Sequence, residues 1–311
     1  MAQNQKTPAE PVEIEGVGLH SGKRIGLRIL PAEADSGIVF VRTDEGRTEI
    51  RASHRLLGSS NYSTSLCRGS VVVATVEHLL SALHGLSIDN ARIELDGPEV
   101  PILDGSARPF VDRIREAGIR TLPRTRRFLM LTRPVRVQAG EREILAIPDN
   151  ALHATYAIDF PHPVIGCQTV AAEITEEAYV ESIAPARTFC LLRDVEAMRR
   201  SGLALGGSLD NALVVGDSGV LNGSLRFPDE FARHKVLDLV GDLALLEAPL
   251  RAHVIAFKGG HKLHAALVER IMSSRSAWSL GTSDDLLPDA RLAEFVHLKD
   301  RLLPHVAVHA G

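Results

Sequence analysis

The sequence has few cysteines and no long apolar run. Its three cysteines, Cys67, Cys167 and Cys190, lie far apart and form no Cys-x-x-Cys pair, which argues against a disulfide framework and against a thiolate zinc site. No apolar run approaches the ~20 residues that a membrane-spanning helix needs, and residues 1–16 contain no apolar signal core. We therefore expect a cytoplasmic protein without a membrane anchor, in which any metal is held by histidine and carboxylate side chains.

The composition also lacks a strong charge bias. Lysine and arginine total 35 and aspartate and glutamate total 39, so the net charge of -4 gives no reason to expect nucleic acid as a partner. Hydrophobic residues make up 45% of the chain and charged residues 24%, which is typical of a globular protein. Against a prior of ~150 residues per domain, the 311 residues predict two domains or one large domain.

Strand-like and helix-like segments are mixed in both halves of the chain. The first dozen residues are polar, contain two prolines and are expected to form a loose tail. The basic segment 122–128 is the best candidate for a boundary between halves of similar size. The residues predict strands at 24–30, 36–42, 91–97, 127–138 and 153–160, and helices at 75–86, after residue 107, at 176–183 and from about residue 231.

The helix expected from about residue 231 contains a polar stripe. His234, Asp238 and Asp242 follow one another at intervals of four residues, so they share one side of the helix. An imidazole and a carboxylate one turn apart can bind the same divalent ion. Taken alone, however, the stripe is explained by a solvated polar face. The opposite side is apolar and consists of Val236, Leu237, Leu239, Val240 and Leu243.

The helix expected at 75–86 offers a third ligand. Thr75 is the expected N-cap, and Glu77 and His78 lie in the first turn, where a hydrolytic metal site could use an adjacent base. Considered by itself, Glu77 needs no catalytic role, because the helix dipole favours an acidic residue in the first turn. The apolar face is formed by Leu79, Leu80, Leu83 and Leu86. Three protein ligands that leave one position for water are the usual pattern of a catalytic zinc site.

Two further segments carry chemically active side chains. Gly259 and Gly260 permit a tight turn that places His261 at the start of a helix, where it can face a pocket. His264, one turn later, is expected to be exposed to solvent. Thr188 and Lys235 are, by themselves, an ordinary strand hydroxyl and a solvated charge.

Six motifs in order resemble one enzyme family. They are GVGLHSGK at 16–23, TVEHLLSALHGLSIDN at 75–90, PILDGSA at 101–107, RTFCLLRD at 187–194, FARHKVLDLVGDL at 231–243 and FKGGHKL at 257–263. Together they resemble the UDP-3-O-acyl-N-acetylglucosamine deacetylase family over residues 12–270, whereas the segment from Ser273 onward carries no such motif. The resemblance implies a cytoplasmic hydrolase of Gram-negative lipid A biosynthesis that removes the acetyl group from a UDP-linked acylated aminosugar.

The resemblance also implies a set of roles. His78, His234 and Asp238 would bind zinc, which lowers the pKa of its water toward ~7. Glu77 would be the general base, and protonated His261 would protonate the departing amine. The roles implied for the remaining residues are oxyanion stabilisation by Thr188, support of His261 by Asp242, and substrate contact by Phe189 and Lys235.

An insert in the second half, at about 187–215, would hold the acyl chain in a hydrophobic passage. Without the resemblance, its apolar residues would be assigned to the core. Where many members of the family have a cysteine near the active site, this chain has Ser63, so a fourth metal contact from cysteine is not expected. The candidate lining residues are Leu192, Val195, Ala204, Gly207, Ser208, Ala212 and Val214.

The implied fold is α+β, with domains at 1–124 and 125–311 and the active site between them. The partner is then a small-molecule substrate, and we expect a monomer. Two alternatives remain open from the residues: a binding module for nucleotide sugars or acyl chains, and a metal-independent hydrolase that uses His261 as base. Hydrolase activity measured before and after removal of the metal distinguishes the zinc hydrolase from these two alternatives.

Overall fold

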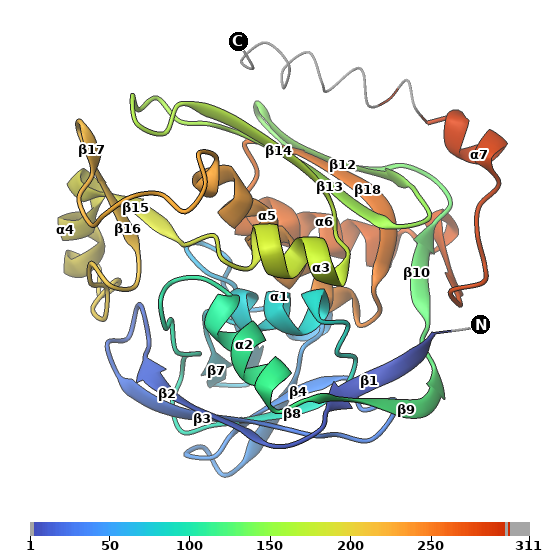
Figure 1. Ribbon diagram of the computed structural model, residues 1–311, viewed down its shortest axis with the longest axis horizontal. Coiled ribbons are helices and arrows are strands. Elements are labelled where there is room, and N and C mark those ends of the chain that lie inside the picture. The colour runs from blue at the N-terminus through green and yellow to red at the C-terminus, as the bar shows by residue number, and fades with distance from the viewer. Residues whose placement is uncertain (1–2, 296–297, 299–311) are drawn as a thin grey trace.

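A computed structural model describes residues 3–295 and residue 298 of the chain. It has an α+β fold, which confirms the expected class. Two large sheets form the outer layers and the main helices lie between them (Figure 1). Within the described residues, no helix is both long enough and apolar enough to cross a membrane.

The first sheet has five strands in the order β2-β3-β8-β4-β5. Alternation predicts one buried face, and in β3 the side chains of Ile25, Leu27 and Ile29 all point into the core. Helices α1 (Glu77–Gly85) and α2 (Arg108–Glu116) cover that face (Figure 1). The strands are β2 (Val12–Val17), β3 (Arg24–Leu30), β4 (Ile38–Arg42), β5 (Thr48–Arg51) and β8 (Ala91–Leu95).

The second sheet has seven strands and is organised around β18, which pairs in parallel with β13 and antiparallel with β12. Helices α5 (Glu230–Leu243) and α6 (His261–Ser273) cover its inner face (Figure 1). The strands are β10 (Phe128–Leu131), β11 (Val135–Ala139), β12 (Arg142–Pro148), β13 (Leu152–Asp159), β14 (Cys167–Glu173), β18 (Leu250–Phe257) and β19 (Trp278–Gly281). The single strand expected at 127–138 is therefore two strands.

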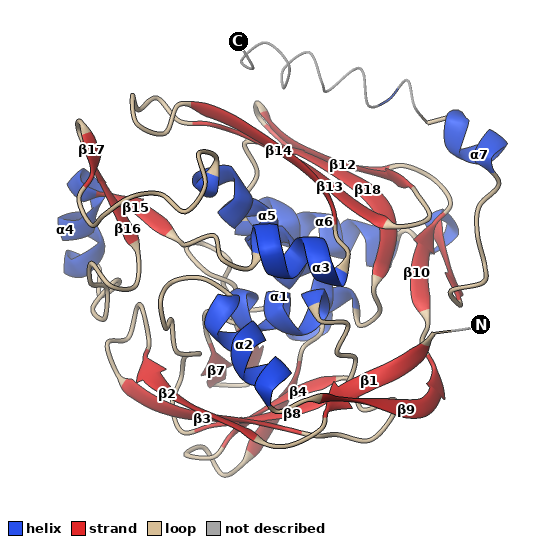
Figure 2. Cartoon of the chain, viewed as in Figure 1, coloured by secondary structure: helices blue, strands red, loops and turns tan. Residues whose placement is uncertain are grey.

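Smaller elements complete the fold, and Figure 2 separates them by type. At one end of the molecule, β15 (Phe189–Leu191), α4 (Leu192–Arg200), β16 (Leu213–Gly216) and β17 (Gly219–Val220) form a three-stranded sheet with one helix. A two-stranded sheet consists of β6 (Leu66–Arg68) and β7 (Val71–Val73). The short helices are α3 (Glu176–Ala178), a π-helical turn at Tyr179–Ile183, α7 (Asp289–Ala293) and 3-10 turns at His54–Leu56, Ala244–Leu246 and Arg275–Ala277.

The expectation of a loose tail at the start of the chain was wrong. Residues Asn4–Pro8 form β1, which pairs antiparallel with β9 (Ile119–Thr125). Two polar residues of this strand, Gln5 and Thr7, are buried because their side chains find hydrogen-bond partners: Thr7 Oγ1 accepts from the amide of Ala32, and Gln5 Nε2 donates to Asp35. Composition alone does not reveal such partners.

Helices α1 and α5 lie against each other between the two sheets, and this contact positions the candidate site. Gly241 permits the close approach, because a Cβ atom there would lie 2.1 Å from the carbonyl oxygen of Glu77. Ser81 Oγ donates to the Leu237 carbonyl across the same contact at 2.8 Å. The first turn of α1 is thereby fixed beside the polar stripe of α5.

Candidate metal centre

His78 from α1 and His234 and Asp238 from α5 come together at this helix contact. One ligand atom from each residue lies within 4.8 Å of the other two. The Nε2 atoms of His78 and His234 lie 3.8 and 3.3 Å from Asp238 Oδ1. Each of these residues is at most 4% exposed, so the stripe on α5 is not the solvated face that spacing alone suggested.

The protonation states of these residues fit a divalent metal. His234 Nδ1 donates to the Ala186 carbonyl at 3.0 Å, which leaves the lone pair of Nε2 directed at the centre. Burial lowers the pKa of His78 to about 3 and also lowers that of His234, so both imidazoles are neutral. Burial opposes the charge of Asp238, but His234, Lys235 and His261 hold the pKa of this carboxyl well below its ordinary value.

One buried oxygen has no partner in this arrangement. Among the described residues, nothing forms a hydrogen bond with Asp238 Oδ1, although the atom is shielded from solvent. A buried carboxylate oxygen without a donor is costly, and a cation removes that cost. Two neutral imidazoles and an unpaired carboxylate oxygen are therefore suited to hold a metal ion.

Lys235 and Phe189 lie at the side of this centre. The ammonium of Lys235 donates to Asp238 Oδ2 at 2.8 Å and lies 5.6 Å from the centre of the Phe189 ring. Lys235 is therefore paired with a candidate ligand and is not the freely solvated charge that its sequence position alone suggested. The Phe189 ring contacts Phe231 edge to face at 4.9 Å and lies 6.4 Å from the His234 ring.

Glu77 lies in the first turn of α1 with its two oxygens in different environments. Oε2 accepts from the amide of Thr64 at 3.0 Å, while Oε1 lies 3.8 Å from His261 Nε2. Burial raises the pKa of Glu77 to about 8, against the opposing charge of His261. A carboxyl group with this pKa can exchange a proton near neutral pH. The expected N-cap was wrong: Val76 precedes the helix, and the Thr75 hydroxyl donates to buried Glu99 instead.

His261 is the first residue of α6 and faces the same centre. Its Nδ1 atom donates to Asp242 Oδ2 at 2.9 Å, and its Nε2 atom lies 3.8 Å from Asp238 Oδ2. Burial alone would lower the pKa of His261, but Asp242, Asp238 and Glu77 outweigh burial and raise it to about 9. His261 is therefore a cation at neutral pH, and its Nε2 proton points toward the candidate ligands.

Thr64 is a site residue that the sequence did not indicate. Its hydroxyl donates to Asp242 Oδ1 at 2.5 Å and lies 3.2 Å from His261 Nδ1, while its amide donates to Glu77. The neighbouring Ser63, which the resemblance drew attention to, is only half-buried. Thr64 lies in a loop without periodicity, so no local pattern could have identified it.

Thr188 lies two residues after the carbonyl that fixes His234. Its amide donates to the Gly105 carbonyl and its own carbonyl accepts from the amide of Leu213, both at 2.8 Å. The side chain is half-buried. These bonds hold the start of β15 between two other segments of the chain.

The insert meets the GVGLHSGK motif. The amides of Leu205 and Gly206 donate to the carbonyls of His20 and Leu19, and His20 Nδ1 accepts from the amide of Ala204. Within the described part of the chain, the buried Nε2 atom of His20 has no hydrogen-bond partner. A residue of this motif is thus placed against the insert, which spacing along the chain did not indicate.

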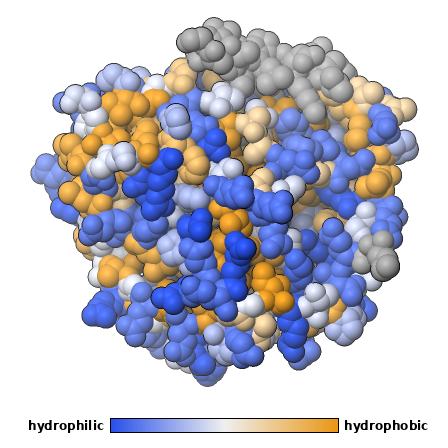
Figure 3. Space-filling model, viewed as in Figure 1, coloured by the Kyte–Doolittle hydropathy of each residue, from blue (hydrophilic) through white to orange (hydrophobic). Residues whose placement is uncertain are grey.

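The seven candidate residues of the acyl passage do not share one environment. Leu192 is 50% exposed and Ser208 is also exposed, whereas Ala212 and Val214 are buried. Val195, Ala204 and Gly207 are half-buried. Hydrophobic residues gather on the surface at this end of the molecule (Figure 3). The exposed leucines here are Leu192, Leu205, Leu209 and Leu221.

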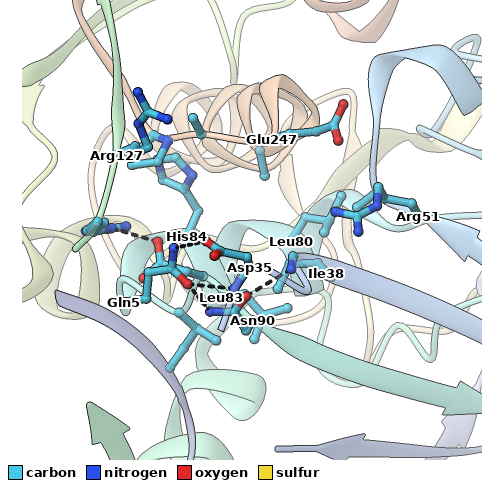
Figure 4. Close-up of a pocket in the computed structure, with 18 of the residues that line it drawn as sticks. Gln5, Asp35, Ile38, Arg51, Leu80, Leu83, His84, Asn90, Arg127 and Glu247 are labelled. Carbon is cyan, nitrogen blue, oxygen red and sulfur yellow. Dashed lines mark hydrogen bonds and ion pairs between the residues drawn. The ribbon is translucent and has the colours of Figure 1, made fainter. Parts of the chain in front are cut away.

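A separate cavity of about 260 Å³ lies beside the C-terminal half of α1, where Leu80, Leu83 and His84 line it. Figure 4 shows His84, Arg51, Arg127 and Glu247 around it. None of the candidate site residues lines this cavity, so it is distinct from the metal centre.

Comparisons with known proteins identify the family. A family model described as UDP-3-O-acyl N-acetylglycosamine deacetylase matches residues 5–273. The protein named UDP-3-O-acyl-N-acetylglucosamine deacetylase from Anaeromyxobacter dehalogenans (strain 2CP-C) is 47% identical over 275 residues, which cover 88% of this chain and 89% of that protein. A protein of the same name from Solibacter usitatus (strain Ellin6076) is 47% identical over 283 residues, which cover 91% and 96% of the two chains. The chain belongs to the UDP-3-O-acyl N-acetylglycosamine deacetylase family.

Proposed function

We propose that zinc is the metal held by His78, His234 and Asp238 in this deacetylase. The chain is a hydrolytic enzyme of lipid A biosynthesis that removes the N-acetyl group from UDP-3-O-acyl-N-acetylglucosamine. The unpaired Oδ1 atom of Asp238, between two neutral imidazoles, is the observation that carries the metal assignment. Two imidazoles and a carboxylate with one open position are a common ligand set of catalytic zinc.

The bound ion would supply Lewis-acid chemistry, which polarises the amide carbonyl and makes water more acidic. Glu77 accepts the proton of the attacking water at Oε1, the oxygen that is not occupied by the Thr64 amide. The water oxygen bonds to the acetyl carbon, and the carbon–nitrogen bond breaks. This assigns base catalysis to a buried carboxylate beside the centre.

His261 provides the second proton transfer. Asp242 holds Nδ1 of His261, so Nε2 is the atom that donates to the leaving nitrogen. The nitrogen then departs as an amine and acetate carries the new oxygen. The carboxylates of Asp242, Asp238 and Glu77 raise the pKa of His261 to about 9, and a protonated imidazole does not favour the alternative in which a metal-independent hydrolase uses His261 as the base.

The remaining roles concern the oxyanion and the substrate. In our proposal the Thr188 hydroxyl donates to the developing oxyanion. Lys235 has three donor positions, of which one reaches Asp238, and a second contacts the substrate beside Phe189. The 3-hydroxyacyl chain would lie against the insert at 187–215, along the seven candidate lining residues. The halves 1–124 and 125–311 are proposed as the two domains that enclose the site.

Metal analysis combined with activity tests this proposal. The purified enzyme should contain about one zinc per chain, lose acetate release on complete removal of the ion by a chelator, and recover it with added zinc. Turnover that survives complete demetallation would reject the mechanism. A binding module would release no acetate in either state.

A further inference from the structure

His264, expected at the surface, is completely buried and belongs to a chain of hydrogen bonds behind His261. Its Nδ1 atom lies 2.8 Å from Asp242 Oδ2, and its Nε2 atom lies 2.9 Å from the hydroxyl of Tyr156 on β13. A Cβ atom at position 259 would lie 2.5 Å from that hydroxyl, so Gly259 provides the space in which Tyr156 reaches the imidazole.

The direction of each hydrogen bond follows from the chemistry of its ends. Burial opposes ionisation of Asp242, but His261 and the bonds from both histidines lower its pKa to about 2, so this carboxylate only accepts. The Nδ1 atom of His264 therefore carries a proton. Burial raises the pKa of Tyr156 well above its ordinary value and lowers that of His264. Tyr156 consequently donates to an unprotonated Nε2 atom of a neutral imidazole.

These bonds restrict the carboxylate that supports His261. Asp242 Oδ1 accepts from Thr64, and Oδ2 accepts from both His264 and His261. Three donors on one carboxylate leave it little freedom to rotate. Because His264 also lies one turn beyond His261 on α6, both histidines that bond to Asp242 belong to the same helix.

We propose that Tyr156 and His264 are positioning residues that hold Asp242, and through it His261, in the orientation that proton donation requires. This inference rests on the role proposed for His261. His264 makes no hydrogen bond to the candidate ligands His78, His234 and Asp238 among the interactions of the described residues, and its exposure to solvent is zero. Its effect on turnover is therefore indirect.

Two substitutions at His264 test whether its hydrogen bond to Asp242 or only the volume of its side chain matters for turnover. In His264→Asn the amide nitrogen takes the place of Nδ1 and can still donate to Asp242, but the bond to the Tyr156 hydroxyl is lost, so kcat should fall by about tenfold, as in Tyr156→Phe. His264→Leu fills the space but removes the donor, and kcat should fall by roughly a hundredfold with KM and zinc content unchanged. If His264→Leu does not fold, the kcat values of His264→Asn, Tyr156→Phe and Tyr179→Phe test the inference without it.

Substitution of the two tyrosines supplies the matched comparison. Tyr156→Phe should lower kcat by about tenfold, because His264 loses the donor at Nε2. Tyr179→Phe removes another buried hydroxyl, which donates to Ser81 outside this network, and should leave kcat unchanged. In the His264→Asn background, Tyr156→Phe should have no further effect, since the shorter amide does not reach the hydroxyl.

Nitrogen-15 NMR of the zinc-loaded enzyme gives a readout independent of activity. His264 should be the neutral tautomer with the proton on Nδ1 throughout the pH range of activity. Protonation of Nε2, or a loss of kcat in Tyr156→Phe no larger than in Tyr179→Phe, would overturn the inference.

His261→Gln separates failure of this inference from failure of the proposed function. If His261→Gln turns over normally, His261 is not the acid and the proposed function is wrong on this point. If His261→Gln is impaired but the Tyr156 and His264 variants are not, only the positioning role is wrong.

Discussion

Two neighbouring clusters in this enzyme contain the same residue types in different states. Each combines one aspartate of α5 with two histidines, and the two aspartates are one helical turn apart. Around Asp238 the imidazole nitrogens lie 3.3 and 3.8 Å from an oxygen without a hydrogen-bond partner among the described residues. Around Asp242 both imidazoles lie at 2.8 to 2.9 Å and the second oxygen accepts from Thr64.

The two clusters differ in whether other protein groups supply the hydrogen bonds that the aspartate and histidines need. Thr64 and Tyr156 complete the hydrogen bonding of the Asp242 cluster, so its protons are already held. Within the part of the chain that the structure describes, the Asp238 carboxylate receives a hydrogen bond on one oxygen only, from Lys235. Residue identity alone therefore does not distinguish a metal site from a proton-holding site, whereas hydrogen-bond satisfaction does.

The largest expected effect separates the clusters directly. Asp238→Asn should lose zinc and reduce kcat/KM by roughly 10⁴-fold, because the ion contributes several kcal/mol to the transition state. Asp242→Asn should keep zinc while turnover also falls. Metal analysis of both variants is the measurement. Equal zinc loss in both would show that the two clusters act as one site.

A somewhat smaller effect is expected for the carboxylate that lies between the clusters. Glu77→Gln removes the base but can still accept from the Thr64 amide, so zinc content should stay normal while kcat falls by about a thousandfold. Acetate release at saturating substrate measures this. Glu247→Gln, a change at an exposed glutamate beside the separate cavity, is the control and should be active. Near-normal turnover of Glu77→Gln would assign the base elsewhere.

The smallest expected effect concerns stability and pH in the metal-free protein. The folded-state pKa of His261 is raised from 6.5 to about 9, so its contribution is complete below pH 6.5 and is lost as pH rises through 9. The difference in unfolding free energy between wild type and His261→Gln should therefore decrease by about 3 kcal/mol over this interval. Urea unfolding at several pH values measures it, and a difference that does not change with pH would contradict the cluster's proposed charge state.

Much of the local structure was predictable, but the environment of the polar stripe was not. The interval of four residues correctly placed His234, Asp238 and Asp242 on one side of a helix. The same spacing also fits a solvated face, and the stripe is buried by the helices that pack against it, α1 from the other half of the chain and α6. Spacing describes one helix, whereas burial depends on what packs against it.

The residues that sequence reasoning missed share a cause. Thr64 lies in a loop, and His264 depends on Tyr156 of a strand 108 positions away along the chain. Their hydrogen-bond partners depend on tertiary contacts, which secondary-structure propensity and hydrophobic periodicity do not predict. The N-terminal strand was missed for the same reason, since its polar side chains are satisfied by distant groups.

The contact of α1 with α5 has a thermodynamic consequence. Because the candidate ligands come from both helices, an ion bound there joins segments that are more than 150 positions apart in the chain. Ligand present at a thousand times its dissociation constant adds about 4 kcal/mol to the folding free energy. Scarcity of the ion would then loosen the association of the two halves as well as halt hydrolysis, so the supply of metal in the cell would also govern how long the folded chain persists.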